Sequence, residues 1–179
     1  SLTNMIRQNS WLKDEGSKNI AIITDAGTPG ISDPGEEVVR QCFEAGIQVT
    51  SLPGPAACIT ALTMSGQKQE DFVLNFLPKD KKEKVAVLEE LKNETRTIII
   101  YEAPHRLART LKELRETLGN RQLTLCRELT KKYEEADKTT IDRAIENTMK
   151  KEPRGEYVLV IEGKSQEEIQ EENKQNGNQ

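Results

Sequence analysis

The stretch TDAGTPGISDPG, residues 24–35, constrains the fold of this chain more than any other part of the sequence. It contains three glycines and two prolines in twelve residues, and it directly follows the apolar run NIAII. A continuous apolar run is typical of a strand that is covered on both faces of a parallel sheet. Ligands bind at the carboxyl ends of such strands, so the stretch predicts a ligand-binding βα loop in an α/β domain.

The side chains of this loop limit the ligand it can hold. The stretch has no Lys, Arg, His or Cys, and it contains neither a GxxxxGK[ST] nor a GxGxxG pattern. An adenosine without phosphates therefore suits the loop better than ATP or NAD. Glycines let a ligand approach the backbone closely, and Asp25 can accept hydrogen bonds from hydroxyl groups. For Asp33, Pro34 and Gly35, a plain helix cap is an equal alternative.

The remaining chain alternates between apolar runs and amphipathic segments, as in an α/β fold. A domain junction is expected between Asn75 and Pro78, where the sequence becomes cationic. Residues 1–75 then belong to a first domain, residues 76–164 to a second, and 165–179 form a polar tail, a fraying helix followed by disorder. We expect helices at 2–15, where only the last part of a helix is present, and at 35–46, 53–66, 81–92, 104–119 and 139–150. Strands are expected at 19–24, 47–52, 96–102, 122–129 and 155–163, and a short one just before Pro78.

Composition excludes several classes of protein. The net charge is −4 and aromatic residues make up only 4% of the chain, so neither a globally basic surface nor a wide stacking platform for nucleic acid is expected. No apolar run approaches the roughly 18 residues of a membrane span. The three cysteines are scattered, which indicates reduced thiols and no zinc site. Cys126, beside Arg127, is expected to be a buried strand residue.

Three further motifs fall at expected strand ends. LPGPAA, residues 52–57, is a turn without bulky side chains, and it can pack either against a ligand or against the sheet. YEAPHR, residues 101–106, gathers Glu102, Arg106 and the only histidine, His105; RELTKKYEE follows at 127–135. One local basic wall, suited to a polyanion, is predicted from Lys79, Lys81, Lys82, Lys84, Arg106, Arg127 and Lys131.

Together these motifs resemble one known family. TDAGTPGISDPG, SLPGPAACITAL, FLP, YEAPHRL, RELTK followed by YEE, and GEYVLVIEG occur in the order and spacing of the ribosomal RNA small-subunit methyltransferase I family. The resemblance covers about residues 10–163. It implies the two-domain tetrapyrrole methylase fold, with a parallel-sheet first domain and a mixed-sheet second domain.

The resemblance also implies a function and a site. The family methylates a cytidine 2′-hydroxyl with S-adenosylmethionine (SAM), which lies in a cleft between the domains. The residues implied to contact SAM are Asp25, Ala26, Gly27, Thr28, Pro29, Ile31, Pro55, Ala56, Ala57 and Leu129. Candidates for a general base are Lys131, His105 and Glu102, in that order. The residues expected to contact RNA phosphates are Lys79, Lys81, Lys82, Arg106 and Arg127, and no metal is expected.

The chain departs from the family at its start. Family members begin with strands and a glycine-bearing loop before the equivalent of Ser1, so about the first third is expected to be missing here. This polypeptide is therefore expected to bind SAM poorly and to be inactive. The resemblance also implies a cytoplasmic homodimer. Its expected partner is small-subunit ribosomal RNA or the ribosomal subunit, and neither DNA nor membrane is expected. The alternatives are a tetrapyrrole-type small-molecule methylase and a non-catalytic fragment that binds RNA or self-associates.

Overall fold

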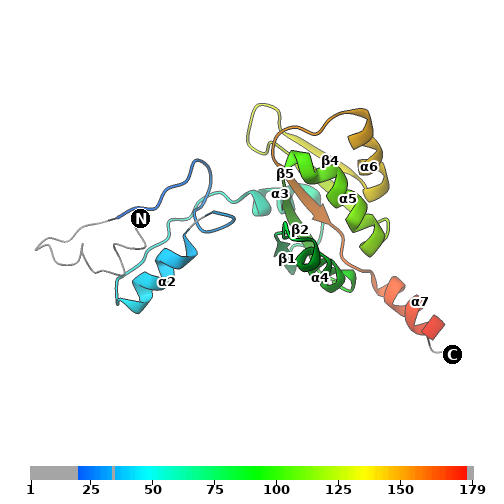
Figure 1. Ribbon diagram of the computed structural model, residues 1–179, viewed down its shortest axis with the longest axis horizontal. Coiled ribbons are helices and arrows are strands. Elements are labelled where there is room, and N and C mark those ends of the chain that lie inside the picture. The colour runs from blue at the N-terminus through cyan, green and yellow to red at the C-terminus, as the bar shows by residue number, and fades with distance from the viewer. Residues whose placement is uncertain (1–19, 34, 177–179) are drawn as a thin grey trace, which may run out of the picture. The chain divides into compact units, whose positions relative to one another are not determined.

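The computed structural model describes residues 20–33 and 35–176 (Figure 1). The expected helical end at 2–15, Asn19, Pro34 and the last three residues lie outside this range. The chain divides into two compact units, Ser1–Ala56 and Ala57–Gln179. The domain boundary expected between Asn75 and Pro78 stays a prediction.

The described part of the first unit contains one helix, α2 (Glu36–Glu44), which confirms the helix expected at 35–46. The strands expected at 19–24 and 47–52 are wrong: residues 20–24 and 47–52 have no regular secondary structure. A strand requires a hydrogen-bonded neighbour, and no described residue of this unit belongs to a strand. Ile23 and Leu52 are accordingly 85% and 79% exposed.

The second unit is built on a five-stranded mixed sheet with the order β1-β2-β5-β3-β4. Strands β1 and β2 are parallel, whereas β2–β5, β5–β3 and β3–β4 are antiparallel. The expected mixed sheet is confirmed, but β4 was missed because its sequence EADKTT has no apolar alternation. The strands are β1 (Phe72–Asn75), β2 (Thr97–Glu102), β3 (Gln122–Arg127), β4 (Glu135–Thr140) and β5 (Tyr157–Ile161).

The helices of this unit begin where the sequence provides caps. The Asp80 carboxylate accepts hydrogen bonds from the backbone N–H groups of Lys82 and Glu83, and the Thr140 hydroxyl accepts one from Arg143. Pro104 occupies the first turn of its helix, where no N–H is needed. The helices are α3 (Ala57–Ser65), α4 (Lys81–Lys92), α5 (Pro104–Leu118), α6 (Ile141–Lys150) and α7 (Gln166–Asn176).

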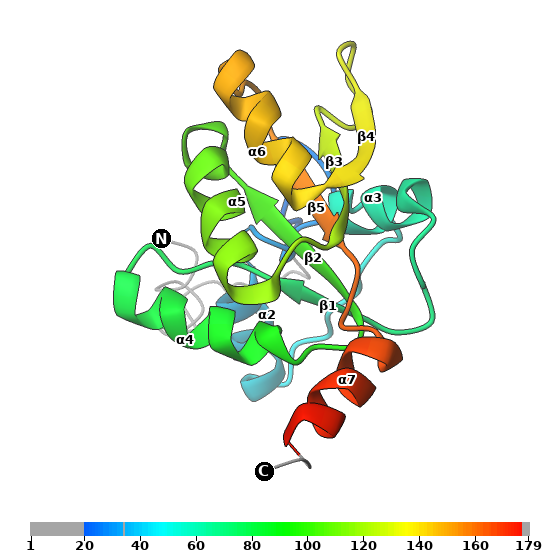
Figure 2. The ribbon, with the colours of Figure 1, turned by 90° about the vertical axis from the view of Figure 1, so that its right-hand side faces the viewer.

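Helices cover both faces of the sheet. Alternate strand residues such as Ile98, Leu123 and Leu159 are fully buried in one cluster with Leu111 and Leu114 of α5. Figure 2 shows α5 and α6 side by side on this face, while α3 packs on β2 and β5 from the other. No helix in the described ranges is long and apolar enough to span a membrane.

Candidate cofactor loop and strand-end cluster

The glycine loop of the first unit is joined to the LPGPAA turn by hydrogen bonds. The Pro55 carbonyl oxygen accepts one bond from the Thr28 backbone N–H at 2.9 Å and another from the Thr28 hydroxyl at 3.1 Å. The Thr24 hydroxyl lies 3.1 Å from the Ala26 carbonyl oxygen and 2.9 Å from that of Gly27. Two segments that are 27 residues apart are thereby held as one backbone-lined surface.

Two glycines make this close approach possible. Gly27 has φ +78°, and a Cβ there would lie 3.0 Å from the Pro55 carbonyl oxygen. A Cβ at Gly54 would lie 2.9 Å from the Thr28 hydroxyl oxygen. A side chain at either position requires its neighbour to shift, so the contact between the turns favours glycine at both.

The polar groups of the loop fit a nucleoside better than a phosphate. Asp25 is exposed, and it makes no hydrogen bond or ion pair with another described residue. A free carboxylate next to backbone groups can accept hydrogen bonds from two ribose hydroxyls. The loop also contains the apolar residues Pro29 and Ile31, and the LPGPAA turn contains Ala56. These residues fit the adenosine part of SAM, whereas the loop has no cation that would bind phosphate.

In the second unit, Glu102 anchors the start of α5. Its side chain is 2% exposed, and it accepts hydrogen bonds from the Ala103 N–H at 2.8 Å and the Thr110 hydroxyl at 2.6 Å. The Arg106 Nε lies 2.9 Å from Oε1 as an ion pair without a well-aligned hydrogen bond. The carboxylate is thus fully engaged, and a role as general base requires the loss of these contacts.

His105 lies in the first turn of α5 and is exposed. It has no hydrogen bond or ion pair with any other described residue. Lys131 and Glu102 are both engaged by other side chains, so His105 is the candidate base whose nitrogen atoms are available to a substrate.

The turn that joins β3 to β4 places Lys131 between two carboxylates. Its Nζ lies 2.7 Å from Glu156 Oε2 and 3.4 Å from Glu128 Oε1. The hydrogen bond to Glu156 and the nearby negative charges raise the pKa of Lys131. Glu128 and Thr130 have φ of +49° and +64°, which is strained for residues other than glycine. This turn carries Leu129, which is half-buried.

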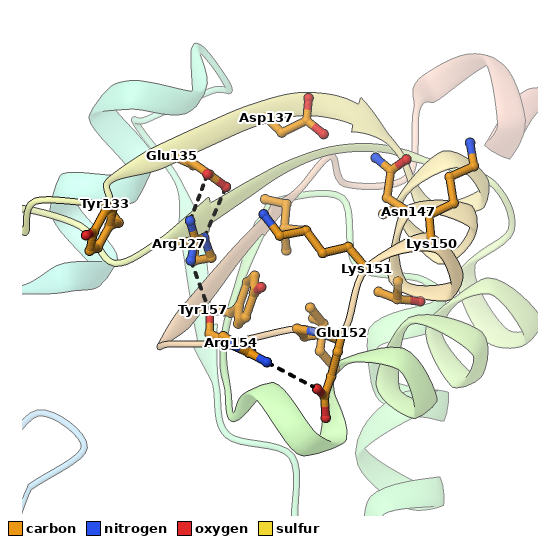
Figure 3. Close-up of a pocket in the computed structure, with 15 residues that line it drawn as sticks. Arg127, Tyr133, Glu135, Asp137, Asn147, Lys150, Lys151, Glu152, Arg154 and Tyr157 are labelled. Carbon is orange, nitrogen blue, oxygen red and sulfur yellow. Dashed lines mark hydrogen bonds and ion pairs between the residues drawn. The ribbon is translucent and has the colours of Figure 1, made fainter.

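Arg127, at the end of β3, is held across the strand pair. Its guanidinium donates two hydrogen bonds to Glu135, from Nε at 3.0 Å and from Nη2 at 2.7 Å (Figure 3). The bonds raise the pKa of Arg127 and lower that of Glu135. A phosphate that binds Arg127 through this edge must displace Glu135.

The cationic residues predicted to form one basic wall lie in different surroundings. Lys79, Lys81 and Lys82 are exposed at the start of α4. The expectation is wrong for Lys84, which is buried, with its Nζ 2.7 Å from Glu113 Oε2. That lysine stabilises the packing of α4 on α5 and is not available to a polyanion.

Cys126 is a buried strand residue, as expected. It has no exposed surface, and burial raises the pKa of its thiol to about 11. The thiol is protonated at neutral pH and is not a nucleophile. Among the described residues, no group of three His, Cys, Asp or Glu side chains is arranged to hold a metal ion.

A cavity of about 550 Å³ on the α6 side of the sheet was not anticipated. It lies between the β3–β4 strand pair and the segment at 150–154, and its walls include Tyr133, Lys151 and Tyr157. The only sequence signal was the cationic run KKEPR at the end of α6, which is common in solvent-exposed loops.

Comparison with known proteins identifies the family. Residues 7–145 match the model of the tetrapyrrole (corrin/porphyrin) methylases. The chain is 40% identical over 154 residues to ribosomal RNA small subunit methyltransferase I of Thermotoga maritima, covering 86% of this chain and 68% of that protein. The chain belongs to this methyltransferase family. The proteins of the same name from Bacillus subtilis and Synechocystis are 49% and 45% identical, each over 90% of this chain.

The family's relatives are longer than this chain. It covers 55% of the B. subtilis protein and 58% of the Synechocystis protein, so it spans about half the length of these relatives. Their names therefore describe proteins of which this chain matches only a part.

Solved structures confirm the fold class. The methyltransferase CobJ superposes with a TM-score of 0.57 at 20% identity, covering 76% of this chain and 62% of that one. Uroporphyrin-III C-methyl transferase from Thermus thermophilus, complexed with S-adenosyl homocysteine, gives 0.54 at 17% identity, with coverage of 76% and 62%. At this identity the likeness establishes the tetrapyrrole methylase fold and nothing finer.

Proposed function

We propose that the complete protein transfers a methyl group from SAM to the 2′-hydroxyl of a cytidine in small-subunit ribosomal RNA. The observation that carries the proposal is the 40% identity to a ribosomal RNA small subunit methyltransferase I of which the chain covers 68%. The backbone-lined loop supports it, because its polar groups suit an adenosine. SAM supplies an electrophilic methyl group when it is bound. We also expect a homodimer in the cytoplasm.

The chain's residues then have separate tasks. Asp25 accepts hydrogen bonds from the ribose hydroxyls of the cofactor, while Gly27, Thr28 and Pro55 keep the loop surface in place. The cofactor contacts that the family implies for Ala57 and Leu129 stay predictions. Holding the methyl group of the cofactor close to the acceptor hydroxyl, and in line with it, accounts for much of the rate enhancement in such a transfer.

His105 is our choice for the group that accepts the proton of the 2′-hydroxyl. Lys131 was the first candidate from sequence, but its raised pKa keeps it protonated at neutral pH. It is better suited to contact a phosphate. Glu102 positions α5, and with it His105, because its carboxylate accepts hydrogen bonds from Ala103 and Thr110 and forms an ion pair with Arg106.

The test is methyl transfer from labelled SAM to small ribosomal subunits by the complete protein. Wild type should methylate a ribose, detected as resistance of one phosphodiester to alkali. We expect His105→Gln to lower kcat by about 10²-fold or more, as for loss of a general base, with RNA affinity unchanged. Arg109→Gln, one turn further along α5, is the matched control. Transfer to a tetrapyrrole and not to ribosomal particles would overturn the proposal.

Arg127→Ala separates the two ligands in the same protein. We expect it to weaken binding of ribosomal RNA while SAM affinity stays at the wild-type value, because Arg127 lies outside the glycine loop. Fluorescence anisotropy for RNA and calorimetry for SAM measure the two constants. A selective loss of SAM binding would contradict this assignment.

A further inference from the structure

The cavity between α6 and the β3–β4 strand pair has the composition of a nucleotide-binding groove. Its floor is apolar and formed by Leu107, Leu125, Ala144 and Tyr157, which belong to the hydrophobic core or pack against it. Its volume of about 550 Å³ lies within the range of pockets that bind small organic ligands. All its lining residues belong to the second unit, at positions 107–157.

The rim of this groove carries one more positive than negative side chain, on a chain whose net charge is −4. Arg127, Lys150, Lys151 and Arg154 line it, together with Glu135, Asp137 and Glu152. Figure 3 shows the Lys151 side chain extending from one wall toward Arg127 on the other. Lys151 makes no ion pair within the described part of the chain. It nevertheless lies close enough to Glu135 for its charge to lower the pKa of that carboxylate.

The two existing ion pairs of the rim are replaceable. Arg154 and Glu152 are 3.8 Å apart, and their side chains are more than 80% exposed. Glu135, the partner of Arg127, is 59% exposed. The Arg154–Glu152 pair is exposed on both sides and contributes little to stability. Arg127 itself is only 17% exposed, but a phosphate offers its guanidinium the same paired oxygens as Glu135 with a higher charge. Glu135 therefore occupies the face of the Arg127 guanidinium that a phosphate would take.

We propose that this groove binds a single-stranded segment of the RNA substrate, with a base on the apolar floor and phosphates on Lys151 and Arg127. Single-stranded RNA is recognised by aromatic rings that contact bases and by cations that contact the backbone. Tyr133, 64% exposed at the rim, offers a further ring. The two tyrosines beside the cations favour RNA over an acidic peptide, because bases stack on aromatic rings. The proposal rests on the proposed function and deepens it by assigning where the RNA strand is held.

The proposal makes predictions of opposite sign for two neighbouring groups. Lys151→Gln removes one cation from the groove and should weaken RNA binding about fivefold, with the salt dependence lowered by about one ion. Glu135→Gln removes the carboxylate that competes with phosphate and should strengthen RNA binding. General damage to the fold would weaken binding in both variants. Lys174→Gln, in α7 and far along the chain from the groove residues, is the charge-matched control.

The experiment uses the complete protein and a fluorescein-labelled single-stranded RNA of about twelve nucleotides. Anisotropy titrations at several salt concentrations give affinity and salt dependence, and methyl transfer to ribosomal subunits is measured for every variant. The groove is supported when Lys151→Gln and Glu135→Gln shift affinity in opposite directions and Lys174→Gln does not. It is overturned when wild type methylates ribosomal RNA yet Lys151→Gln behaves like Lys174→Gln, or when polyglutamate displaces the RNA at equal charge concentration. Failure of wild type to methylate ribosomal RNA counts instead against the proposed function.

A second readout maps the contact directly. RNA carrying 4-thiouridine should crosslink, on irradiation, to peptides that contain Tyr133 or Tyr157. Crosslinks confined to peptides outside residues 107–157 would overturn the assignment, even if the charge variants behave as expected.

Discussion

Similar apolar sequences are buried in the second unit of this chain and exposed in the first. In the second unit, Ile98, Ile99 and Ile100 of β2 are completely buried between helices. In the first unit, the run AII at residues 21–23 ends in Ile23, which is 85% exposed. Only Gln41 is buried among the described residues of that unit. Apolar character alone does not make a strand; a hydrogen-bonded neighbour and a covering layer do.

The units also differ in how their candidate sites are built. In the first unit, hydrogen bonds between Thr28 and Pro55 hold the loop, and the adjacent Gly27 and Gly54 leave room for this close contact. The second holds its polar side chains with carboxylates, as in Glu102–Arg106 and Arg127–Glu135. Backbone-built sites should therefore be sensitive to added volume, and side-chain-built sites to changes of charge.

The largest expected contrast between the units is in thiol reactivity. Cys126 is fully buried with a pKa of about 11, and Cys42 of the first unit is half-buried. At pH 8 the thiolate fraction of Cys126 is on the order of 10⁻³, and burial adds further protection. We expect Cys42 to react with iodoacetamide at least about a hundredfold faster. Mass spectrometry of labelled peptides over time measures both rates.

Denaturation should remove this contrast. In guanidinium chloride both thiols are exposed, and their rates should differ by no more than a few fold. Equal rates under native conditions would contradict the difference in burial between the units.

The next largest effect is on stability. Leu114→Ala removes a side chain with no exposed surface from the core beneath α5, and should lower the free energy of unfolding by about 2–5 kcal/mol. Phe43→Ala in α2 removes a larger side chain that is 70% exposed, and should lower it by well under about 1 kcal/mol. Chemical denaturation monitored by circular dichroism compares them. Equal losses would show that Phe43 is covered in solution.

Sequence was a good guide where local signals and tertiary structure agree. Helices α2 and α4 and the strands β2 and β3 begin and end within two residues of their expected positions. Caps such as Asp80 and the Pro104 turn are readable from sequence because they act within one turn of the helix. The mixed sheet, in contrast, came from the family resemblance.

The sequence did not predict strand pairing, burial or pKa where these depend on a residue far along the chain. Strand β4 is polar except for Ala136, and it exists because each of its residues pairs with β3. The burial of Lys84 depends on Glu113, 29 positions further along the chain. The raised pKa of Lys131 likewise arises first from its hydrogen bond to Glu156, 25 positions further along the chain.

Two glycine substitutions test whether the first unit's loop is built from backbone contacts. Gly27→Ala places a Cβ 3.0 Å from the Pro55 carbonyl oxygen at φ +78°, so the Pro55 carbonyl must shift away from the loop. Gly30→Ala has a similar φ of +85° but no atom within 4 Å. Both carry a backbone cost of about 1–2 kcal/mol, and only Gly27→Ala disturbs the contact.

We therefore expect Gly27→Ala to weaken binding of S-adenosyl homocysteine about tenfold more than Gly30→Ala does in the complete protein. Isothermal calorimetry measures both affinities. Identical losses would mean that strain, and not the contact with Pro55, determines the shape of the loop.

The smallest effect concerns a side-chain contact of the second unit at low pH. The Glu94 carboxylate accepts hydrogen bonds from the Arg96 N–H, Nε and Nη2 at 2.8–2.9 Å, and these bonds lower its pKa from 4.5 to about 2. A carboxyl whose pKa is lower in the folded state stabilises the fold above its unfolded pKa. This stabilisation is present above pH 4.5 and is lost as the pH falls toward 2.

Glu94→Gln should thus destabilise the protein at pH 7 by about 1 kcal/mol or less, because Arg96 is 44% exposed to solvent. The difference from wild type should shrink between pH 4.5 and pH 2, as measured by urea denaturation at a series of pH values. Arg40→Gln in α2 breaks the contacts of Arg40 with Glu37 and Glu44, which are exposed on the first unit, and should change stability at no pH. If Arg40→Gln shows the larger effect, side-chain contacts matter as much in the first unit as in the second, and the distinction between a backbone-built and a side-chain-built unit fails.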